Sequence, residues 1–313
     1  MSTRPYKPDV EQEYDLVGLI EDFGSEDKCH EYLEDLRWPD GVKCPRCESD
    51  KISRIAKRRQ FDCDSCRYQF SVRVGTVFHD SKLPLWKWFL AVYLMCESKK
   101  GISANQMKRT LGISYKSAWY LCHRIRSAME GDGGELLSGI VEADETFIGG
   151  VKHAANRREA ARVRRDNKTV VLGAIERGGK LRLRVATNAG HGAIHAFLGE
   201  VVDPDAEAIY TDSWRSYRGI GDANTRHEWV NHAADEWVRG DVHTNTVENA
   251  WSLFKRSIIG SYHHLSVKHL PAYLDEMEWR FNNRENPFLF RDTILKLVEA
   301  DALPFKELVS KSG

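Results

Sequence analysis

Hydrophobic positions along the chain change their spacing twice within the first 130 residues. From Leu16 to Leu36 they recur at helical intervals in an acidic sequence, which predicts two short amphipathic helices. Between Val42 and Val77 short β-type runs alternate with cysteine pairs, as in a small β-module. Helical spacing then returns over residues 83–98, 103–111 and 114–129. The first part of the chain is therefore predicted to enclose a small β-module between helices.

A glycine-rich stretch, Gly131 to Gly134, predicts a linker, and the pattern after it alternates between strands and helices. Strands are expected at Ser138 to Ile148, Thr169 to Ile175, Leu181 to Ala186 and Ala208 to Thr211, with helices at Ala193 to Val202, Asn245 to Ile258 and Leu265 to Arg284. This order predicts a second domain of the α/β class.

Composition is that of an ordinary globular protein. The chain has 313 residues, 42% of them hydrophobic, with a mean hydropathy of −0.51, so it can form about two domains and is not disordered throughout. The longest apolar run, from Phe89 to Met95, is far shorter than the ~18 residues of a membrane span. Because the first residues contain no apolar signal core, we expect a cytoplasmic protein without membrane association.

The net charge of zero hides a strong asymmetry. Residues 1–40 contain 4 Lys and Arg against 12 Asp and Glu, whereas residues 41–130 contain 18 against 7. A concentrated basic segment suits a polyanion-binding module, because each basic side chain placed on a phosphate releases counterions. A solvated charged surface explains the charge alone equally well.

Four cysteines have the spacing of a zinc site. Cys44 and Cys47 form one C-x2-C pair, Cys63 and Cys66 form another, and fifteen residues separate the pairs. Four thiolates complete a tetrahedral shell and leave no open position. The spacing thus predicts one structural Zn²⁺ ion.

The two helical segments after the cysteines have the form of a helix-turn-helix. Ser103 and Ser114 are predicted helix caps, and Gly112 supplies the turn between the helices. An ordinary helical hairpin is the alternative, but the adjacent zinc pattern and the basic charge favour DNA binding. The predicted DNA-binding residues are Lys108, Arg109, Tyr115, Lys116, Arg124 and Arg126.

Three acids occupy positions that suggest a functional site. An ionised carboxylate inside an apolar strand is costly unless a positive charge lies beside it, and an acid at the end of a buried strand is placed as ligands are in α/β sheets. Asp144 lies inside an apolar strand, Asp212 ends another, and Glu248 lies on a predicted helix, with 67 and 35 residues between them. Lys255 follows Glu248 by two helical turns and lies on the same face. Each acid alone is more often a surface or capping residue, but the group together suggests a catalytic site.

Two further sets of residues allow two interpretations each. A basic run from Arg157 to Lys168 follows the first predicted strand of the second domain. It is either a clamp on DNA or a solvated loop. Trp214, Trp237 and Trp251 are candidates for stacking on unpaired bases, with core packing as the safer assignment.

These features together resemble bacterial insertion-sequence transposases of the DDE type. The resemblance extends from about Leu16 to Arg284. The segments that carry it are Arg37-Trp-Pro-Asp-Gly, Gly75-Thr-Val-Phe-His, Asp144-Glu-Thr-Phe-Ile-Gly-Gly150, His243-x-Asn245-x-x-Glu248-Asn249 with Lys255-Arg256, and Arg280-Phe-Asn-Asn-Arg284.

The resemblance implies a multidomain α/β protein. Its parts are an acidic helical segment (1–40), a zinc ribbon (41–78), a helical helix-turn-helix domain (79–130), a ribonuclease-H-like mixed sheet flanked by helices (138–285) and a C-terminal helical tail (286–313). Asp144, Asp212 and Glu248 are implied to hold two catalytic Mg²⁺ or Mn²⁺ ions, with Lys255 as the basic residue. His243, Asn245 and Asn249 are expected to be supporting residues. Since His243 and Asn245 lie within a turn of Glu248, they could orient it or contact a substrate phosphate, although Asn245 is equally suited to cap a helix.

The implied function is that of a transposase that binds the double-stranded DNA ends of its element, hydrolyses a phosphodiester and joins the end to target DNA. We expect a homo-oligomer on DNA, associated with the nucleoid. Two alternatives are a non-catalytic DNA-binding regulator on the same scaffold and a structure-specific nuclease that stops at hydrolysis. Metal-dependent cleavage excludes the first, and strand-transfer product excludes the second.

Overall fold

The computed structural model describes residues 14–131, 134–149, 168–263 and 265–310. The chain divides into two compact units, one made of Met1–Met129 with Arg284–Gly313 and the other of Glu130–Asn283. The boundary at Glu130 directly precedes the predicted linker. The basic run predicted from Arg157 onwards lies outside the described residues, apart from Lys168.

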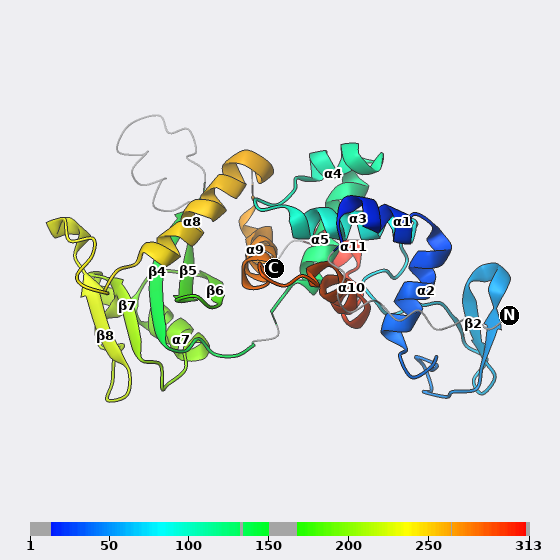
Figure 1. Cartoon of the computed structure of the whole chain (residues 1–313), viewed down its shortest axis with the longest axis horizontal. Helices are drawn as coiled ribbons and strands as arrows, with labels where there is room; N and C mark the ends of the chain where they lie inside the picture. Colours follow the sequence, from blue (N-terminus) through cyan, green and yellow to red (C-terminus); the bar gives the residue numbers. More distant parts are fainter. Residues whose placement is uncertain (1–13, 132–133, 150–167, 264, 311–313) are drawn as a thin grey trace. The chain divides into compact units, whose positions relative to one another are not determined.

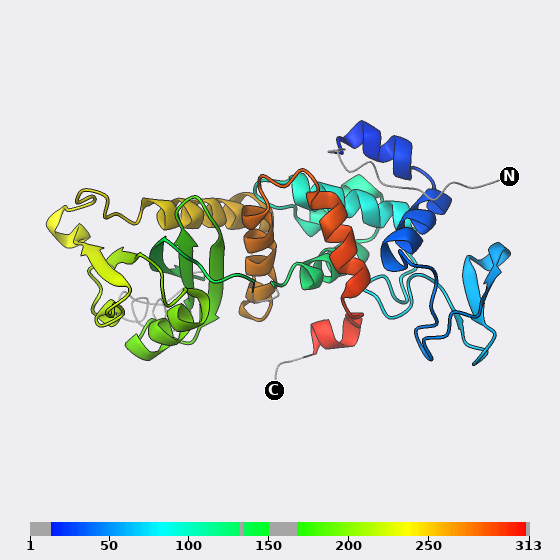
Figure 2. The same cartoon turned by 60° about the horizontal axis from the view of Figure 1, so that its bottom comes forward.

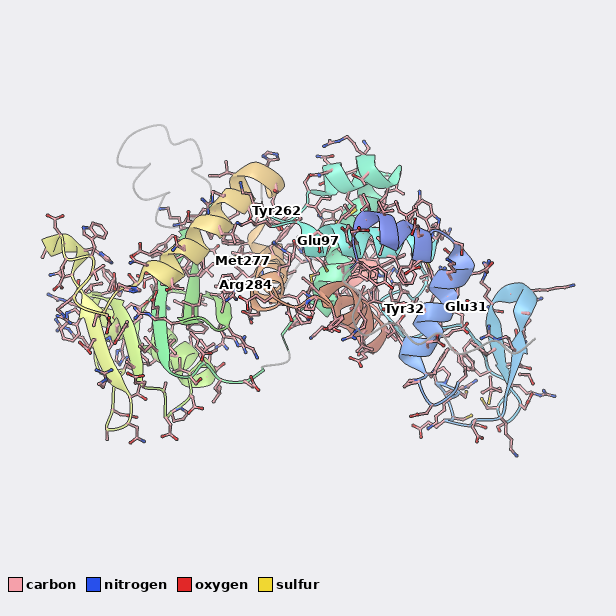
Figure 3. The ribbon with its side chains drawn as sticks, in the orientation of Figure 1. Glu31, Tyr32, Glu97, Tyr262, Met277 and Arg284 are labelled. Atoms are coloured by element: carbon pink, nitrogen blue, oxygen red, sulfur yellow. The ribbon has the colours of Figure 1, made fainter. Side chains whose placement is uncertain are left out.

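The first unit begins with the two predicted helices, α1 (Leu16–Phe23) and α2 (Glu26–Arg37). Asp15 and Ser25 cap them by accepting hydrogen bonds from the backbone N–H groups of the first turns. Tyr32 of α2, labelled in Figure 3, packs on the ring of Phe23 at 4.8 Å and on that of Phe89 at 5.8 Å. The acidic segment is thus an amphipathic pair whose apolar face is buried.

The small β-module follows as three antiparallel strands, β1 (Ile52–Ile55), β2 (Gln60–Cys63) and β3 (Gln69–Phe70), with the short helix η1 (Ala56–Arg58) between the first two. Its core is a few aromatic rings and two of the cysteines. Trp38, directly after α2, packs edge-on against Phe61 and Phe70 and so joins the helix to the module.

Three helices complete this part of the first unit: α3 (Leu85–Glu97), α4 (Ala104–Leu111) and α5 (Tyr115–Ala128). Ser103 and Ser114 accept hydrogen bonds from N–H groups three residues further on, as the sequence predicts. Gly112 ends α4 with φ +60°, a conformation that favours glycine.

The C-terminal residues are not a separate tail. Helix α10 (Leu289–Glu299) buries Phe290, Ile294 and Leu297, which lie on one face of the helix, and it packs against α2, α3 and α5. The backbone N–H of Val77 donates to the Leu297 carbonyl at 3.2 Å. The short helix α11 (Phe305–Val309) follows. The last residues therefore complete the core of the first unit, which neighbouring sequence alone could not show.

The second unit is built on a mixed five-stranded sheet of order β6-β5-β4-β7-β8. Its strands are β4 (Ile140–Ile148), β5 (Thr169–Glu176), β6 (Leu181–Ala186), β7 (Ala208–Asp212) and β8 (Arg226–Val230). The central strand β4 is antiparallel to β5 and parallel to β7. This arrangement confirms the predicted ribonuclease-H-like sheet, while β8 is a strand that the sequence pattern did not predict.

Helices cover both faces of this sheet, as Figures 1 and 2 show. On one face lies α7 (His191–Val201), packed on apolar residues of β4 and β5. On the other lie α8 (Asn245–Ser257) and α9 (Leu270–Asn282), whose contacts include Trp251 and Met277, the latter labelled in Figure 3. The π-helical turn η4 (Ile258–Tyr262) continues α8, and the 3-10 turns η2 (Arg215–Tyr217), η3 (His232–Ala234) and η5 (Val267–His269) complete the unit.

Within the described residues, no helix combines the length and the apolar character needed to cross a membrane.

Candidate functional site

The four cysteines of the β-module converge on one point. Their sulfur atoms all lie within 4.8 Å of one another, and the Sγ–Sγ distances are 3.7 Å for Cys44 and Cys66 and 3.5 Å for Cys47 and Cys63. A tetrahedral ion with bonds of ~2.3 Å requires sulfur separations of about 3.8 Å. The cluster therefore has the dimensions of a structural zinc site.

Local backbone geometry builds this cluster. In each pair, the N–H four residues after the first cysteine donates to that cysteine's carbonyl at 2.8 Å. The donors are Glu48 and Arg67, and both have a positive φ, 59° and 57°. The two turns thus have the same conformation and present both thiols of a pair to one side.

The three predicted catalytic acids come from three elements on one side of the mixed sheet. Asp144 lies in the middle of β4, Asp212 ends β7, and Glu248 lies in the first turn of α8. Because β4 and β7 pair in parallel with Glu142 opposite Tyr210, the same register continued by two residues places Asp144 beside Asp212. On the other flank of Asp144, its β5 partner Gly173 lies under the Trp251 ring of α8.

The pKa of Asp144 reflects the acids that surround it. Burial, together with the negative charges of Glu145, Asp212 and Glu248, raises the pKa of Asp144 to about 7. The neighbouring Glu145 also has a raised pKa, mainly through burial, although Tyr217 donates a hydrogen bond to it at 2.7 Å. A site that gathers this much negative charge suits a cation.

The three carboxylates do not converge as the thiols do. Among the described residues, the cysteine cluster is the only group of three or more potential ligand atoms that lie within 4.8 Å of one another. Asp212 accepts a hydrogen bond from the Trp214 N–H at 2.9 Å, and Glu248 accepts one from the Thr244 hydroxyl at 2.9 Å. His232 also approaches Glu248, at 3.6 Å. Asp212 and Glu248 are therefore each held by their own partners.

A fourth acid, Glu142, is one that sequence reasoning missed. It lies two residues before Asp144, on the same face of β4, and is fully buried. Its carboxylate accepts hydrogen bonds from the backbone N–H groups of Thr246 and Val247 at 2.7 and 3.2 Å and from Arg177 at 2.7 Å. Glu142 thus caps the N-terminus of α8 from the neighbouring strand. The sequence did contain a signal for Glu142, because it is a second acid two residues before Asp144 in the same apolar run.

The predicted supporting residues have different positions from those expected. His243 approaches Glu142, with 3.2 Å from Nδ1 to the carboxylate, and not Glu248. Asn245 is the first residue of α8 and is exposed, while Thr244 occupies the cap position. Asn249 and Lys255 are exposed further along α8. Glu142, and not Asn245, caps the N-terminus of α8.

The predicted DNA-binding residues divide into two groups. Lys108, Arg109, Tyr115 and Lys116 are exposed, at the end of α4 and the start of α5. Arg124 and Arg126 are each only 2% exposed. Arg124 donates to the His79 carbonyl at 2.6 Å and lies over the Trp88 and Tyr120 rings. The DNA-contact prediction for these two arginines is wrong, because their side chains pack inside the unit.

Some of the charge asymmetry is cancelled within the first unit. Glu34 of α2 pairs with Arg54, Asp27 pairs with Arg59 at 2.6 Å, and Glu26 pairs with Arg73 at 2.5 Å. Acids of the N-terminal segment therefore neutralise arginines of the basic segment.

A four-cysteine ribbon, a turn-linked helix pair and a ribonuclease-H-like sheet with acids at its centre define the class of DDE-type transposases. Comparison with known families agrees: the ISXO2-like transposase domain matches residues 136–282, and the transposase zinc-ribbon domain matches residues 24–69. The chain belongs to the family of ISXO2-like transposases with an N-terminal zinc ribbon.

Individual relatives point the same way. A protein in the transposable element ISH50 of Halobacterium salinarum is 31% identical over 277 residues, covering 83% of this chain and 92% of its own. A transposase-like protein of Haemophilus influenzae is 31% identical over 101 residues, or 32% of this chain and 80% of its own. A chain in a simian T-cell lymphotropic virus intasome structure aligns with 70% of this chain and over 70% of its own length, at 10% identity and with a TM-score of 0.28.

Proposed function

We propose that this protein is a DNA transposase whose first unit binds the ends of its element and whose second unit hydrolyses a phosphodiester and transfers the strand to target DNA. Asp144, Asp212 and Glu248 would hold two Mg²⁺ or Mn²⁺ ions. The observation that carries the proposal is the placement of three acids from β4, β7 and α8 on one side of a ribonuclease-H-like sheet.

The residues present fit divalent cations. Carboxylate oxygens are the ligands that Mg²⁺ and Mn²⁺ prefer, and the mutual repulsion felt at Asp144 is what a bound cation relieves. When bound, such ions align the nucleophile and neutralise charge that develops on the phosphate.

The chain's own residues position this site. Glu142 holds the N-terminus of α8, and through that helix the backbone of Glu248, against the strand that carries Asp144. Thr244 orients the Glu248 carboxylate. Lys255, exposed two turns further along α8, would contact a DNA phosphate.

End recognition is assigned to the exposed residues of the first unit. The start of α5, with Tyr115 and Lys116, would face the DNA groove, since the first residues of a recognition helix contact base edges. Lys108 and Arg109 would contact phosphates. Synapsis of two ends implies a homo-oligomer on DNA, and a role on genomic DNA implies a nucleoid-associated protein of the cytoplasm.

The decisive experiment compares cleavage and joining of labelled element-end DNA by single variants. Asp144→Ala, Asp212→Ala and Glu248→Ala should each abolish chemistry, because each removes an anionic ligand, while end binding is retained. Lys255→Ala should be milder. Asn249→Ala, next to Glu248 on the exposed side of α8, is the matched control and should stay active.

Each contrary outcome has a defined meaning. Activity that persists in chelator, or full activity in Glu248→Ala, contradicts the metal-carboxylate mechanism. Sequence-specific DNA binding without cleavage at any metal concentration identifies a regulator. Hydrolysis without strand-transfer product identifies a nuclease.

A further inference from the structure

An open pocket of about 630 Å³ lies next to Asp212, at the carboxyl ends of β7 and β8. Its volume is within the ~300–1,000 Å³ range of sites that hold small organic groups. It is lined by Asp212, Ser213, Trp214, Arg215, Arg218, Gly219, His227, Trp229 and Asn231. We call it the Trp214–Trp229 pocket.

Two tryptophans of this pocket are exposed to an unusual degree. Trp214 is 52% exposed and Trp229 is 49% exposed, whereas Trp251, in the core of the same unit, is 3% exposed. Of the three predicted stacking candidates, Trp214 and Trp237 are thus exposed and Trp251 is a core residue, while Trp229 is an exposed tryptophan that the sequence did not single out. Large aromatic side chains left in solvent beside a pocket are typical of binding surfaces, since burial elsewhere would stabilise the fold.

The pocket also has the charge that suits a phosphate. Arg215 and Arg218 are exposed on its wall, and neither guanidinium is ion-paired with any residue in the described ranges. Aromatic faces together with free cations are the two components of single-stranded nucleic-acid sites.

The pocket adjoins Asp212, and this position indicates that its occupant is part of the DNA strand that reacts there. The Trp214 backbone N–H donates to the Asp212 carboxylate at 2.9 Å, so the loop that carries the tryptophan starts at the acid itself. A DNA strand with its reacting phosphate near Asp212 therefore has its adjoining nucleotide within reach of the pocket. A paired base keeps both faces stacked in the duplex, so only an unpaired one can enter.

We propose that the Trp214–Trp229 pocket binds an unpaired nucleotide of the DNA strand that reacts at Asp212, with its base against an indole ring and its phosphate toward Arg215 and Arg218. The inference rests on the proposed transposase function and adds to it the separation of strands next to the reacting bond. Stacking of one base on an aromatic side chain commonly changes affinity by about fivefold to a hundredfold.

The test measures binding of the zinc-loaded full chain to two element-end duplexes that differ only in three unpaired nucleotides at the reacting end. Mg²⁺ and Mn²⁺ are left out so that no chemistry occurs. The wild type should bind the overhang duplex at least about fivefold more tightly than the blunt one. Trp214→Leu combined with Trp229→Leu should remove this preference, while Trp214→Phe with Trp229→Phe should retain most of it.

One control variant and one further variant separate base stacking from phosphate contact. Trp86→Leu replaces an exposed tryptophan of the first unit and should leave the overhang preference unchanged. Arg215→Ala with Arg218→Ala should lower the salt dependence of overhang binding without removing quenching of a fluorescent 2-aminopurine placed in the overhang.

Equal overhang preference in wild type and the leucine variant overturns the proposal, as does a wild type that does not distinguish the two duplexes. Cleavage and joining, measured separately with Mg²⁺, report on the proposed function. Normal strand transfer without overhang preference refutes only the pocket, and overhang preference without any chemistry refutes only the transposase function.

Discussion

The two candidate metal centres of this chain are organised in opposite ways. Four thiols of the ribbon already lie within 4.8 Å of one another. In the second unit, Asp212 and Glu248 are near enough to raise the pKa of Asp144, yet each is bound to a separate partner. The ribbon site is assembled by two short turns of the same conformation. The acid site is assembled from β4, β7 and α8, far apart in the sequence.

This difference suits different functions. A structural ion has to be held in a closed shell that contributes to folding, so its ligands are arranged by local backbone geometry. Catalytic ions have to share their coordination with substrate oxygens, so separate elements supply a few ligands and leave space. The comparison can be tested by perturbing each centre and its supports.

Removing a thiol should have the largest effect. Cys63→Ser should lose the zinc ion and unfold the ribbon, because metal binding contributes about 10–16 kcal/mol in small zinc modules and the ribbon core contains few side chains. Elemental analysis and the near-ultraviolet signal of Trp38 report the two losses. Cys122→Ser, a buried cysteine outside the cluster, should retain one zinc ion per chain. Unchanged zinc in Cys63→Ser would refute the site.

Breaking the support of the acid site should come next. Glu142→Ala should lower the unfolding free energy by about 3–5 kcal/mol, because Arg177 is left without its buried partner and α8 loses its cap. Glu142→Gln should cost roughly half as much, since an amide oxygen still accepts hydrogen bonds. Urea denaturation measures both.

An exposed ion pair provides the control for Glu142. Glu207→Ala removes a partner that lies 3.0 Å from Arg226 at the surface, and should change stability by less than about 1 kcal/mol. A Glu142→Ala variant no less stable than Glu207→Ala would contradict the capping role.

A half-buried acid outside the site should give a pH-dependent effect. Partial burial, together with repulsion from Glu130 and Glu278, raises the pKa of Asp275 to about 7, against an unfolded value of 3.8. Between these values the folded chain binds more protons than the unfolded chain, so wild-type stability falls as pH rises from about 4 to 7. Asp275→Asn should therefore gain up to about 4 kcal/mol at pH 8 and nothing at pH 4. A gain independent of pH would exclude this cause.

The smallest effect concerns DNA affinity. Lys116→Ala should reduce the slope of log affinity against log salt by about 1, because an exposed contact to phosphate is lost. Arg124→Met should lower stability without changing that slope, because Arg124 is buried. Fluorescence anisotropy over a salt series distinguishes them, and a reduced slope in Arg124→Met would restore that arginine to the DNA surface.

Periodicity and short-range spacing were sufficient wherever neighbours in sequence determine the structure. The two N-terminal helices, the capped pair α4 and α5, and the strands β4 to β7 lie within a few residues of their predicted bounds. The cysteine cluster was predictable as well, because each C-x2-C turn closes on itself. The resemblance to a transposase family rested on these local motifs, and the family match bears it out.

Contacts between residues distant in sequence decided the rest. Glu142 caps α8 across more than a hundred residues, α10 returns to the first unit, and Arg124 turns inward although its charge suggested DNA. Only the fold could separate exposed Trp214 from buried Trp251. The physical reason is that hydrogen bonds within one turn depend on nearby residue types, whereas burial of a side chain depends on which distant element covers it.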